Sequence, residues 1–225
     1  MITEPLLTEE IGNNMDIEKF ALSRPFVYHL SNRQNLESIL ETGFLYSTEE
    51  ISDIVKLESK GEFLTTRRRG CINLSLGKRS FHVRDQDPLS EVILSKCLEP
   101  GWTIPKYVAL LNSKVFFWPT VGDLEKHFAR YERAKEDLII FRLSTEELFS
   151  VNNQRPKFCH LNSGGPRASS WHKGKGSPRG SSTFRIADEY PLGPSTVREV
   201  TFEKSCKLPS SIMIAKKPNG PFKKA

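Results

Sequence analysis

Hydrophobic and polar positions follow two periods along the chain, one typical of strands and one typical of helices. Compact apolar or alternating runs predict strands. These runs are residues 26–30, 107–111, 114–118, 137–143, 196–203 and 211–215. Apolar residues at helical spacing predict the remaining elements. The expected helices cover residues 15–22, 32–42, 49–57, 88–98, 121–131 and 145–149.

The clearest local pattern is a strand followed directly by a helix near residue 30. Residues 26–30 (FVYHL) predict the strand, and Ser31 with Gln34 three positions later matches a capping box. An apolar stripe at helical spacing follows within Leu36–Leu40, and Gly43 predicts the end of the helix. We therefore expect a tight strand–helix unit with His29 at its turn.

A second informative pattern lies near the end of the chain. Residues 196–203 (TVREVTFE) alternate Val200 and Phe202 with Glu199 and Glu203, as expected of a strand buried on one face only. This alternation places the two carboxylates on the face away from the core. Without further information, either carboxylate could be an ordinary solvated strand residue.

Two segments lack both periods and are expected to be irregular. Residues 67–84 are rich in basic side chains and predict a loop with short structured pieces. Residues 163–182 are dominated by Gly, Ser and basic residues, and a loop of this length within a compact domain is usually functional or disordered. Residues 1–24 form a lead-in, and residues 216–225 a basic tail.

The length of 225 residues suits one sizeable core, so we expect a single domain over residues 1–225. No apolar stretch approaches the length of a membrane span, and acidic residues near the start argue against an export signal. The widely spaced cysteines predict free thiols in a reducing, cytoplasmic setting. They are Cys71, Cys97, Cys159 and Cys206.

Charge and motifs narrow the classes of function. The chain carries 33 basic and 27 acidic residues, a formal net charge of +6, which suits a polyanionic partner or simply a basic surface. The sequence contains no Rossmann glycine pattern, P-loop, zinc-protease helix motif or serine-hydrolase elbow. No paired Cys and His spacing predicts a metal site.

Three stretches together carry a resemblance. Tyr28–Ser31 forms an aromatic–histidine–serine turn, and residues 35–43 match the helix pattern N-L-x-x-I-L-x-x-G. Residues 106–119 (KYVALLNSKVFFWP) and 196–202 (TVREVTF) follow in order. In this order the stretches resemble the ADP-ribosyltransferase superfamily. The likeness is greatest to its DarT type, toxins that modify bases in DNA, or to a sister family of that type.

The resemblance implies an α+β fold, with two small packed β-sheets around an NAD cleft and flanking helices. It also implies that NAD is the substrate and that His29 hydrogen-bonds its ribose. Leu30, Ser31 and Asn35 belong to the same turn and are implied to lie in the NAD site. His29 is expected one residue before a helix N-terminus, where backbone amides and the helix dipole favour an electronegative ligand group. The alternative for His29 is a buried histidine that only joins strand to helix.

Glu199 matches the catalytic glutamate that this superfamily keeps in a late strand. Cleavage of the nicotinamide–ribose bond passes through an oxocarbenium-like sugar, which a nearby carboxylate stabilises. The same carboxylate can orient or deprotonate the acceptor. Glu203 is the alternative on the same strand face.

An aromatic side chain and an arginine complete the implied NAD site. Phe116 and Phe117 stand where the superfamily stacks an aromatic ring on nicotinamide; both could instead be core residues, and Trp118 is a third candidate. Arg84 is the match for an arginine that DarT-like enzymes keep between the first helix and the aromatic strand. Residues 67–69 (RRR) compete for that role.

The loop before the glutamate, residues 163–195, is implied to recognise the acceptor. Trp171, Arg179 and Arg185 give it an aromatic ring and charges suited to a stacked base and phosphates. We therefore expect an NAD-dependent mono-ADP-ribosyltransferase acting on nucleic acid, of the kind found among toxins and phage-defence effectors. An antitoxin or ADP-ribosyl hydrolase is an implied partner. The alternatives are a non-catalytic nucleic-acid-binding module, an RNA 2′-phosphotransferase and a protein ADP-ribosyltransferase.

Overall fold

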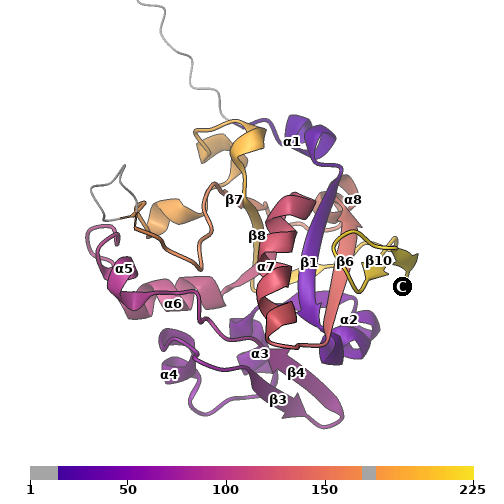
Figure 1. The fold of residues 1–225 in the computed structure, drawn as a ribbon, viewed down its shortest axis with the longest axis horizontal. Coiled ribbons are helices and arrows are strands. Elements are labelled where there is room, and N and C mark those ends of the chain that lie inside the picture. The colour runs from indigo at the N-terminus through magenta and orange to yellow at the C-terminus, as the bar shows by residue number, and fades with distance from the viewer. Residues whose placement is uncertain (1–14, 169–175) are drawn as a thin grey trace, which may run out of the picture.

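The computed structural model describes residues 15–168 and 176–225. Over these residues the chain is an α+β protein with four small antiparallel sheets (Figure 1). The α+β class predicted from the sequence is therefore confirmed. No helix in the described residues is both long and apolar enough to cross a membrane.

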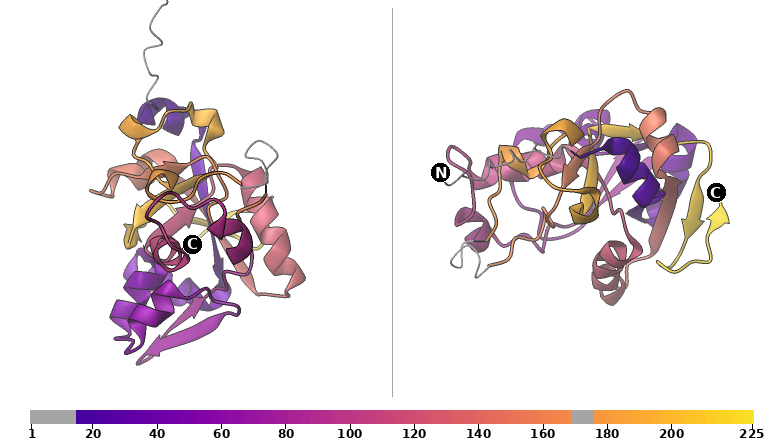
Figure 2. Two further views of the ribbon diagram at one scale, coloured as in Figure 1. Left: turned by 90° about the vertical axis from the view of Figure 1, so that its left-hand side faces the viewer. Right: turned by 90° about the horizontal axis from the view of Figure 1, so that it is seen from above.

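The largest sheet has four strands in the order β1-β6-β10-β11. Its strands are β1 (Phe26–Asn32), β6 (Leu138–Ser144), β10 (Met213–Ala215) and β11 (Lys223–Lys224). Strand β11 lies within the predicted basic tail, so part of that tail pairs with the sheet. The C-terminal strands lie at one edge of the molecule (Figure 2).

Helix α7 (Val121–Arg133) lies beside β1 in Figure 1. It packs Leu124 and Phe128 against Tyr28 and Leu30 of β1. The helical spacing predicted for these residues is confirmed. Because side chains alternate along a strand, His29 projects from the opposite face of β1 to Tyr28 and Leu30.

The second main sheet has three strands in the order β5-β8-β7. They are β5 (Lys114–Phe117), β7 (Lys157–Cys159) and β8 (Glu199–Glu203). Val200 and Phe202 of β8 face the main hydrophobic core, as predicted. Glu199 and Thr201 are also buried, so the expectation of one solvated face was wrong. The reason is that a second hydrophobic cluster, which includes Cys159 of β7 and contacts Phe116 of β5, covers this face of the sheet.

The two main sheets join at a single backbone bridge between Tyr28 and Trp118. The Tyr28 amide donates to the Trp118 carbonyl at 2.9 Å, and the Trp118 amide donates back at 2.8 Å. Because Trp118 directly follows β5, this exchange fixes β1 beside β5. Strand β5 thus connects the sheet that carries His29 to the sheet that carries Glu199.

Short elements surround the two sheets. The helical ones are α1 (Ile17–Ser23), η1 (Arg33–Asn35), α2 (Leu36–Thr42), α3 (Thr48–Ile54), α4 (Lys60–Thr65), α5 (Glu91–Ser95), α6 (Ile104–Asn112) and α8 (Thr145–Ser150). The remaining strands pair as β2 (Phe44–Tyr46) with β9 (Ser205–Lys207) and β3 (Ile72–Leu76) with β4 (Arg79–Val83).

The strand–helix unit around His29 forms as predicted, with one change at its cap. Asn32, and not Ser31, accepts the hydrogen bond from the Gln34 amide. Strand β1 runs two residues further than expected, so the cap moves by one position. Gly43 ends α2 in the left-handed conformation, with φ of 69°, as its position predicted.

Two secondary-structure predictions were wrong. Residues 107–111 lie in helix α6, which Thr103 caps by accepting from the Lys106 amide. Tyr107, Val108 and Leu111 are buried at helical spacing, a pattern that a short apolar run shares with a strand. Most of the basic segment 67–84 forms the β3–β4 hairpin and is not a loop.

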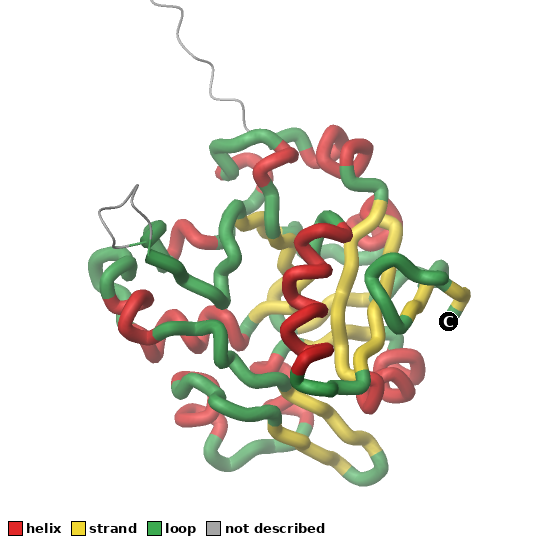
Figure 3. Tube along the Cα trace, viewed as in Figure 1, coloured by secondary structure: helices red, strands yellow, loops and turns green. Residues whose placement is uncertain are grey.

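The chain between β7 and β8 is mostly loop (Figure 3). Its regular pieces are the short 3₁₀ helices η3 (Ser181–Thr183), η4 (Ala187–Glu189) and η5 (Pro194–Thr196). Phe158 of β7 exchanges two backbone hydrogen bonds with Arg185, at 2.7 and 3.1 Å, and so anchors the loop to the small sheet. The loop-like composition predicted for this segment is confirmed for its described part.

Candidate functional site

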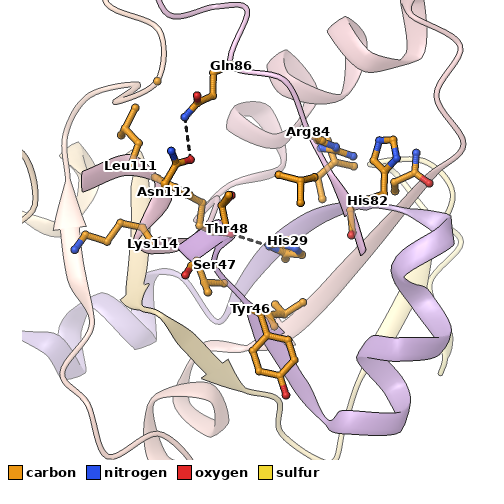
Figure 4. A pocket seen from close by; sticks show the side chains of 18 of the residues that line it. His29, Tyr46, Ser47, Thr48, His82, Arg84, Gln86, Leu111, Asn112 and Lys114 are labelled. Atoms are coloured by element: carbon orange, nitrogen blue, oxygen red, sulfur yellow. Dashed lines mark hydrogen bonds between the residues drawn. The ribbon is translucent and has the colours of Figure 1, made fainter. Parts of the chain in front are cut away.

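A cavity of about 280 Å³ lies beside β5, between β1, β4 and the start of β8. Figure 4 shows some of these side chains around it, among them His29 from β1, Arg84, which follows β4, and Lys114 from β5. Most residues predicted for the site line this cavity. They are His29, Leu30, Ser31, Asn35, Arg84, Phe116 and Glu199.

Strand pairing explains why His29 and Glu199 share the cavity although they lie far apart in sequence. The carbonyl of Phe116 on β5 accepts a hydrogen bond from His29 Nδ1 at 2.9 Å. On its other side, β5 pairs with β8, placing Phe117 opposite Val200, one residue from Glu199. One short strand therefore positions both side chains.

Glu199 is 4% exposed, and only one of its two carboxylate oxygens has a hydrogen-bond partner. Oε1 accepts a hydrogen bond from the Ser163 amide at 3.1 Å, and Oε2 has no hydrogen-bond partner. Burial raises the pKa of Glu199 to about 7, and the contact with Ser163 offsets only part of that effect. A carboxylate with a free oxygen and a raised pKa is typical of functional sites.

Glu203, the alternative on the same strand face, has a different environment. Lys157 lies 2.8 Å from Glu203 Oε1, and Lys114 forms a second ion pair with the same oxygen. Burial would raise the pKa of Glu203, but the hydrogen bonds from both lysines outweigh burial and lower it. Glu203 does not line the cavity, so of these two glutamates it is Glu199 that is available to a ligand there.

His29 is held as a neutral imidazole. Burial lowers its pKa to about 4, against a smaller opposing effect of the hydrogen bond to the Phe116 carbonyl. Because a carbonyl can only accept, Nδ1 carries the proton and Nε2 keeps its lone pair. His29 can therefore accept a hydrogen bond from a ligand hydroxyl group.

Arg84 brings a cationic group to the same cavity. Its guanidinium lies over the Tyr131 ring, 4.3 Å from the ring centroid, and its Nε is 3.5 Å from Glu136 Oε2. Its buried Nε and Nη2 atoms have no hydrogen-bond partner. Burial lowers the pKa of Arg84, because the charged form loses hydration. Free donors on a desolvated cation suit an anionic ligand such as a phosphate.

Of the three neighbouring arginines that compete with Arg84, only Arg68 lines the cavity. Arg67 forms an ion pair with Asp87, and Arg69 forms one with Glu91. Arg68 donates to Asn112 Oδ1 at 2.8 Å and to the Arg84 carbonyl at 3.0 Å. Burial lowers the pKa of Arg68 to about 10. The cavity thus has two buried guanidinium groups.

The aromatic candidates separate clearly. Phe116 is half-buried and lines the cavity, whereas Phe117 is fully buried and packs edge-on against Phe202. The placement of Phe117 in the binding site was therefore wrong, because alternation along β5 turns it into the core. Trp118 also lines the cavity, and its buried Nε1 has no hydrogen-bond partner.

Ser31 and Asn35 line the cavity and also stabilise its wall. The Asn35 amide nitrogen donates to Ser31 Oγ at 3.1 Å and to the His82 carbonyl at 3.0 Å. Its amide oxygen accepts from the His82 backbone at 2.7 Å. Asn35 therefore joins the end of β1 to strand β4. Leu30 is buried against helix α7 and contributes an apolar surface.

The predicted acceptor residues take other positions. Arg179 is buried and donates to the carbonyls of Ser177 and Asn162 at 3.0 and 3.2 Å. Arg185 donates to two loop carbonyls, at 3.2 and 3.3 Å. Neither arginine lines the cavity, because both guanidinium groups hold the loop backbone. Trp171 lies outside the described residues.

Several polar residues of the cavity had no recognisable signal in the sequence. Ser163, Asn112, His82 and His127 line it from different elements. Buried atoms without a hydrogen-bond partner occur on Trp118, Arg84, Ser163 and Glu199 in its lining. Because buried polar groups are normally satisfied, this set of donors and one carboxylate oxygen fits a polar ligand.

Comparison with protein families gives one match, to a family of unknown function (DUF7002), over residues 25–213. The chain belongs to the DUF7002 family. The DUF7002 match begins just before β1 and ends at the start of β10, so it contains every residue of the cavity. Comparisons with curated proteins and with solved structures gave no match.

Proposed function

We propose that this protein is an NAD-dependent mono-ADP-ribosyltransferase with an ADP-ribosyltransferase fold, acting on nucleic acid. The observation that supports this most strongly is the shared cavity of His29 and Glu199. These are the two residues that the resemblance to the superfamily makes central. They come from opposite ends of the chain, and two residues so far apart in sequence are not expected to share one cavity by chance.

Glu199 would act on the reacting sugar. Cleavage of the nicotinamide–ribose bond develops positive charge on the ribose, and an ionised carboxylate nearby stabilises that charge. The free Oε2 of Glu199 is suited to this role. The same oxygen could accept the proton of an acceptor group. Both roles require the carboxylate to be ionised.

The other cavity residues suit the remaining parts of NAD. His29, with Nε2 as an acceptor, would bind a ribose hydroxyl group. Arg84 has free donors for a phosphate, and Arg68 adds a second positive charge. Phe116 offers an aromatic surface for nicotinamide. These residues would bind and orient the substrate and exclude water.

The loop before β8 supports a nucleic-acid acceptor. Its first residues contact the proposed catalytic group, since the Ser163 amide donates to Glu199 Oε1 at 3.1 Å. The net charge of +6 over the whole chain favours a polyanionic partner. The acceptor would therefore approach the cavity from the side of residues 162–164.

A second candidate function, RNA 2′-phosphotransfer, is favoured by one specific feature. That reaction also uses NAD, and its family relies on several arginines and a second histidine around the phosphate. Arg68 and Arg84 line the cavity together with His82 and His127. The sequence pattern around His29 did not predict that these two arginines and two further histidines would lie together.

Labelled NAD distinguishes these functions. Purified full-length protein is incubated with NAD labelled in its adenylate phosphate and with separate pools of DNA, RNA, 2′-phosphorylated RNA and protein. We expect label to accumulate in DNA or RNA. Glu199→Gln should reduce the rate about 10²–10³-fold, the usual loss when one group that stabilises transition-state charge is removed.

Glu203→Gln is the matched control, because it makes the same chemical change on the same strand outside the cavity. It should keep nearly the wild-type rate. NAD-dependent loss of the 2′-phosphate would establish the second candidate instead. The absence of both label transfer and nicotinamide release, in every pool, would refute the enzymatic proposal.

A further inference from the structure

Three side chains with metal-binding atoms meet at His82, which also lines the cavity. Cys71 precedes β3, His82 lies on β4, and Glu136 follows the end of α7. One ligand atom from each lies within 4.8 Å of the others. The thiol, the imidazole and the carboxylate therefore converge from two separate parts of the chain.

The contacts among these groups are long: Cys71 and Glu136 are at the distance of a sulfur hydrogen bond, and His82 and Glu136 are beyond hydrogen-bond distance. His82 Nε2 lies 4.0 Å from Glu136 Oε2, and Cys71 Sγ lies 3.7 Å from Glu136 Oε1. His82 Nε2 and Glu136 Oε2 are both buried and have no hydrogen-bond partner. Ligand atoms around a tetrahedral zinc ion are separated by about 3.3–3.7 Å, from the usual zinc–ligand distances. The separations of 4.0 and 3.7 Å exceed that spacing by at most about 0.7 Å, and all three ligand atoms lie within 4.8 Å of one another.

The imidazole of His82 is already oriented as a ligand. Its Nδ1 lies 2.9 Å from Asn73 Oδ1, and with that oxygen as the acceptor Nε2 keeps its lone pair. Metal-binding histidines usually donate their second nitrogen to such an outer partner. The backbone of His82 is also fixed, by hydrogen bonds to both sides of the Asn35 amide.

We propose that Cys71, His82 and Glu136 bind a Zn²⁺ ion that ties the β3–β4 hairpin to the end of helix α7. The donor set of one sulfur, one nitrogen and one oxygen matches the ligand preferences of zinc. Cys71 is exposed and gives the ion a path from solvent. Three protein ligands leave the fourth tetrahedral position to water.

Zinc at this site would also act on Arg84. Glu136 Oε2, a ligand of the proposed ion, is the carboxylate oxygen 3.5 Å from Arg84 Nε. Coordination would draw the negative charge of Glu136 toward the metal. The guanidinium would then have less of its charge compensated and more available for an anion in the cavity.

Metal titration tests the site without any NAD-dependent reaction. Chelator-treated, full-length protein is titrated with Zn²⁺ by calorimetry and with Co²⁺ by absorption spectroscopy. We expect one Zn²⁺ per chain and a thiolate-to-cobalt charge-transfer band. Cys71→Ser should abolish that band, and Cys71→Ser, His82→Gln and Glu136→Gln should each weaken Zn²⁺ binding at least about tenfold.

The matched control is His160→Gln, which changes an exposed histidine outside the cluster and should leave Zn²⁺ affinity unchanged. Circular dichroism of the metal-free variants checks that each is folded. Cys71→Ser alters an exposed side chain by a single atom, so it decides the test if another variant misfolds. Wild-type protein that takes up no Zn²⁺, or Cys71→Ser protein with wild-type affinity, would overturn the proposal.

Discussion

At the scale of residues, the two glutamates of β8 show how the environment separates identical side chains. Glu199 is buried with a free oxygen and a pKa raised to about 7, whereas two lysines lower the pKa of Glu203. Sequence alternation placed both on one face of the strand, and it could not distinguish them. The distinction depends on Lys114 and Lys157, which reach Glu203 from the neighbouring strands.

The raised pKa of Glu199 predicts a pH-dependent cost in stability. A carboxylate with a pKa of about 7 when folded and 4.5 when unfolded contributes fully below pH 4.5, and this contribution is lost as pH rises through 7. Glu199→Gln should therefore gain stability relative to the wild type between pH 4.5 and 8, by about 3 kcal/mol at most. Urea unfolding at a series of pH values measures this difference.

Glu203→Gln provides the opposite case for that measurement. Its lowered folded pKa predicts stability that is present above pH 4.5 and lost only at lower pH. The difference between Glu203→Gln and the wild type should therefore be constant from pH 5.5 to 8. A Glu199→Gln difference that is equally constant would mean that Glu199 titrates normally in the folded protein.

The sequence predicted the types of residue that line the cavity, but it did not predict which of several neighbouring residues of one type does so. Phe116 and Phe117 are equivalent in a short strand until the core side is known. Arg68 differs from its neighbours only in burial, which local composition does not encode. Arg179 was expected at a ligand, but its guanidinium satisfies loop carbonyls. Such assignments depend on contacts between distant segments.

At the scale of elements, β5 is the part that builds the site. It bonds to β1 through Trp118 and pairs with β8 along its length. The strand itself was predicted, but the preceding residues 107–111 were assigned to a strand and form helix α6. A short apolar run fits both periods, and the helix is favoured by the Thr103 cap and by Pro105 in the first turn.

Asn35 is expected to be important for stability because it connects two elements. Its side chain makes hydrogen bonds of 3.1 and 3.0 Å through its nitrogen and 2.7 Å through its oxygen, joining β1 to β4. Asn35→Ala leaves the His82 backbone groups unpaired in a half-buried setting. We predict a loss of roughly 1–3 kcal/mol in the free energy of unfolding.

Asn153→Ala is the comparison for that prediction, since Asn153 is an exposed loop residue. Its effect should stay within about 0.5 kcal/mol. Chemical denaturation of both variants gives the two values. A similar small effect for Asn35→Ala would show that water replaces these hydrogen bonds and that β4 is not held through Asn35.

At the scale of the whole molecule, the cavity exists because two antiparallel sheets meet at one bridge. The sequence predicted the α+β class and most of the elements, including β10 within residues 211–215, but it did not predict β11 in the basic tail. It did not predict the β3–β4 hairpin, which carries Arg84 and His82 toward the cavity. In this hairpin, exposed basic and polar residues on both faces obscure the alternation of apolar and polar positions that predicts a strand.

Convergence over long sequence separations also hid the proposed zinc site. Cys71 and Glu136 are 65 positions apart and contact only in the folded chain. No local spacing of Cys or His predicts such a site, because its ligands come from a hairpin and from the end of a helix. The same holds for His29 and Glu199: no local pattern predicted that they share a site, and the expectation came from the resemblance to the superfamily.

The most direct test of the account is a structure of the Glu199→Gln protein determined with saturating NAD. This variant should bind the dinucleotide without consuming it. We predict NAD in the cavity beside β5, with a ribose hydroxyl group on His29, a phosphate near Arg84 and the nicotinamide-bearing ribose beside position 199. NAD bound on another surface, or a cavity that stays free of nucleotide at saturation, would contradict the account.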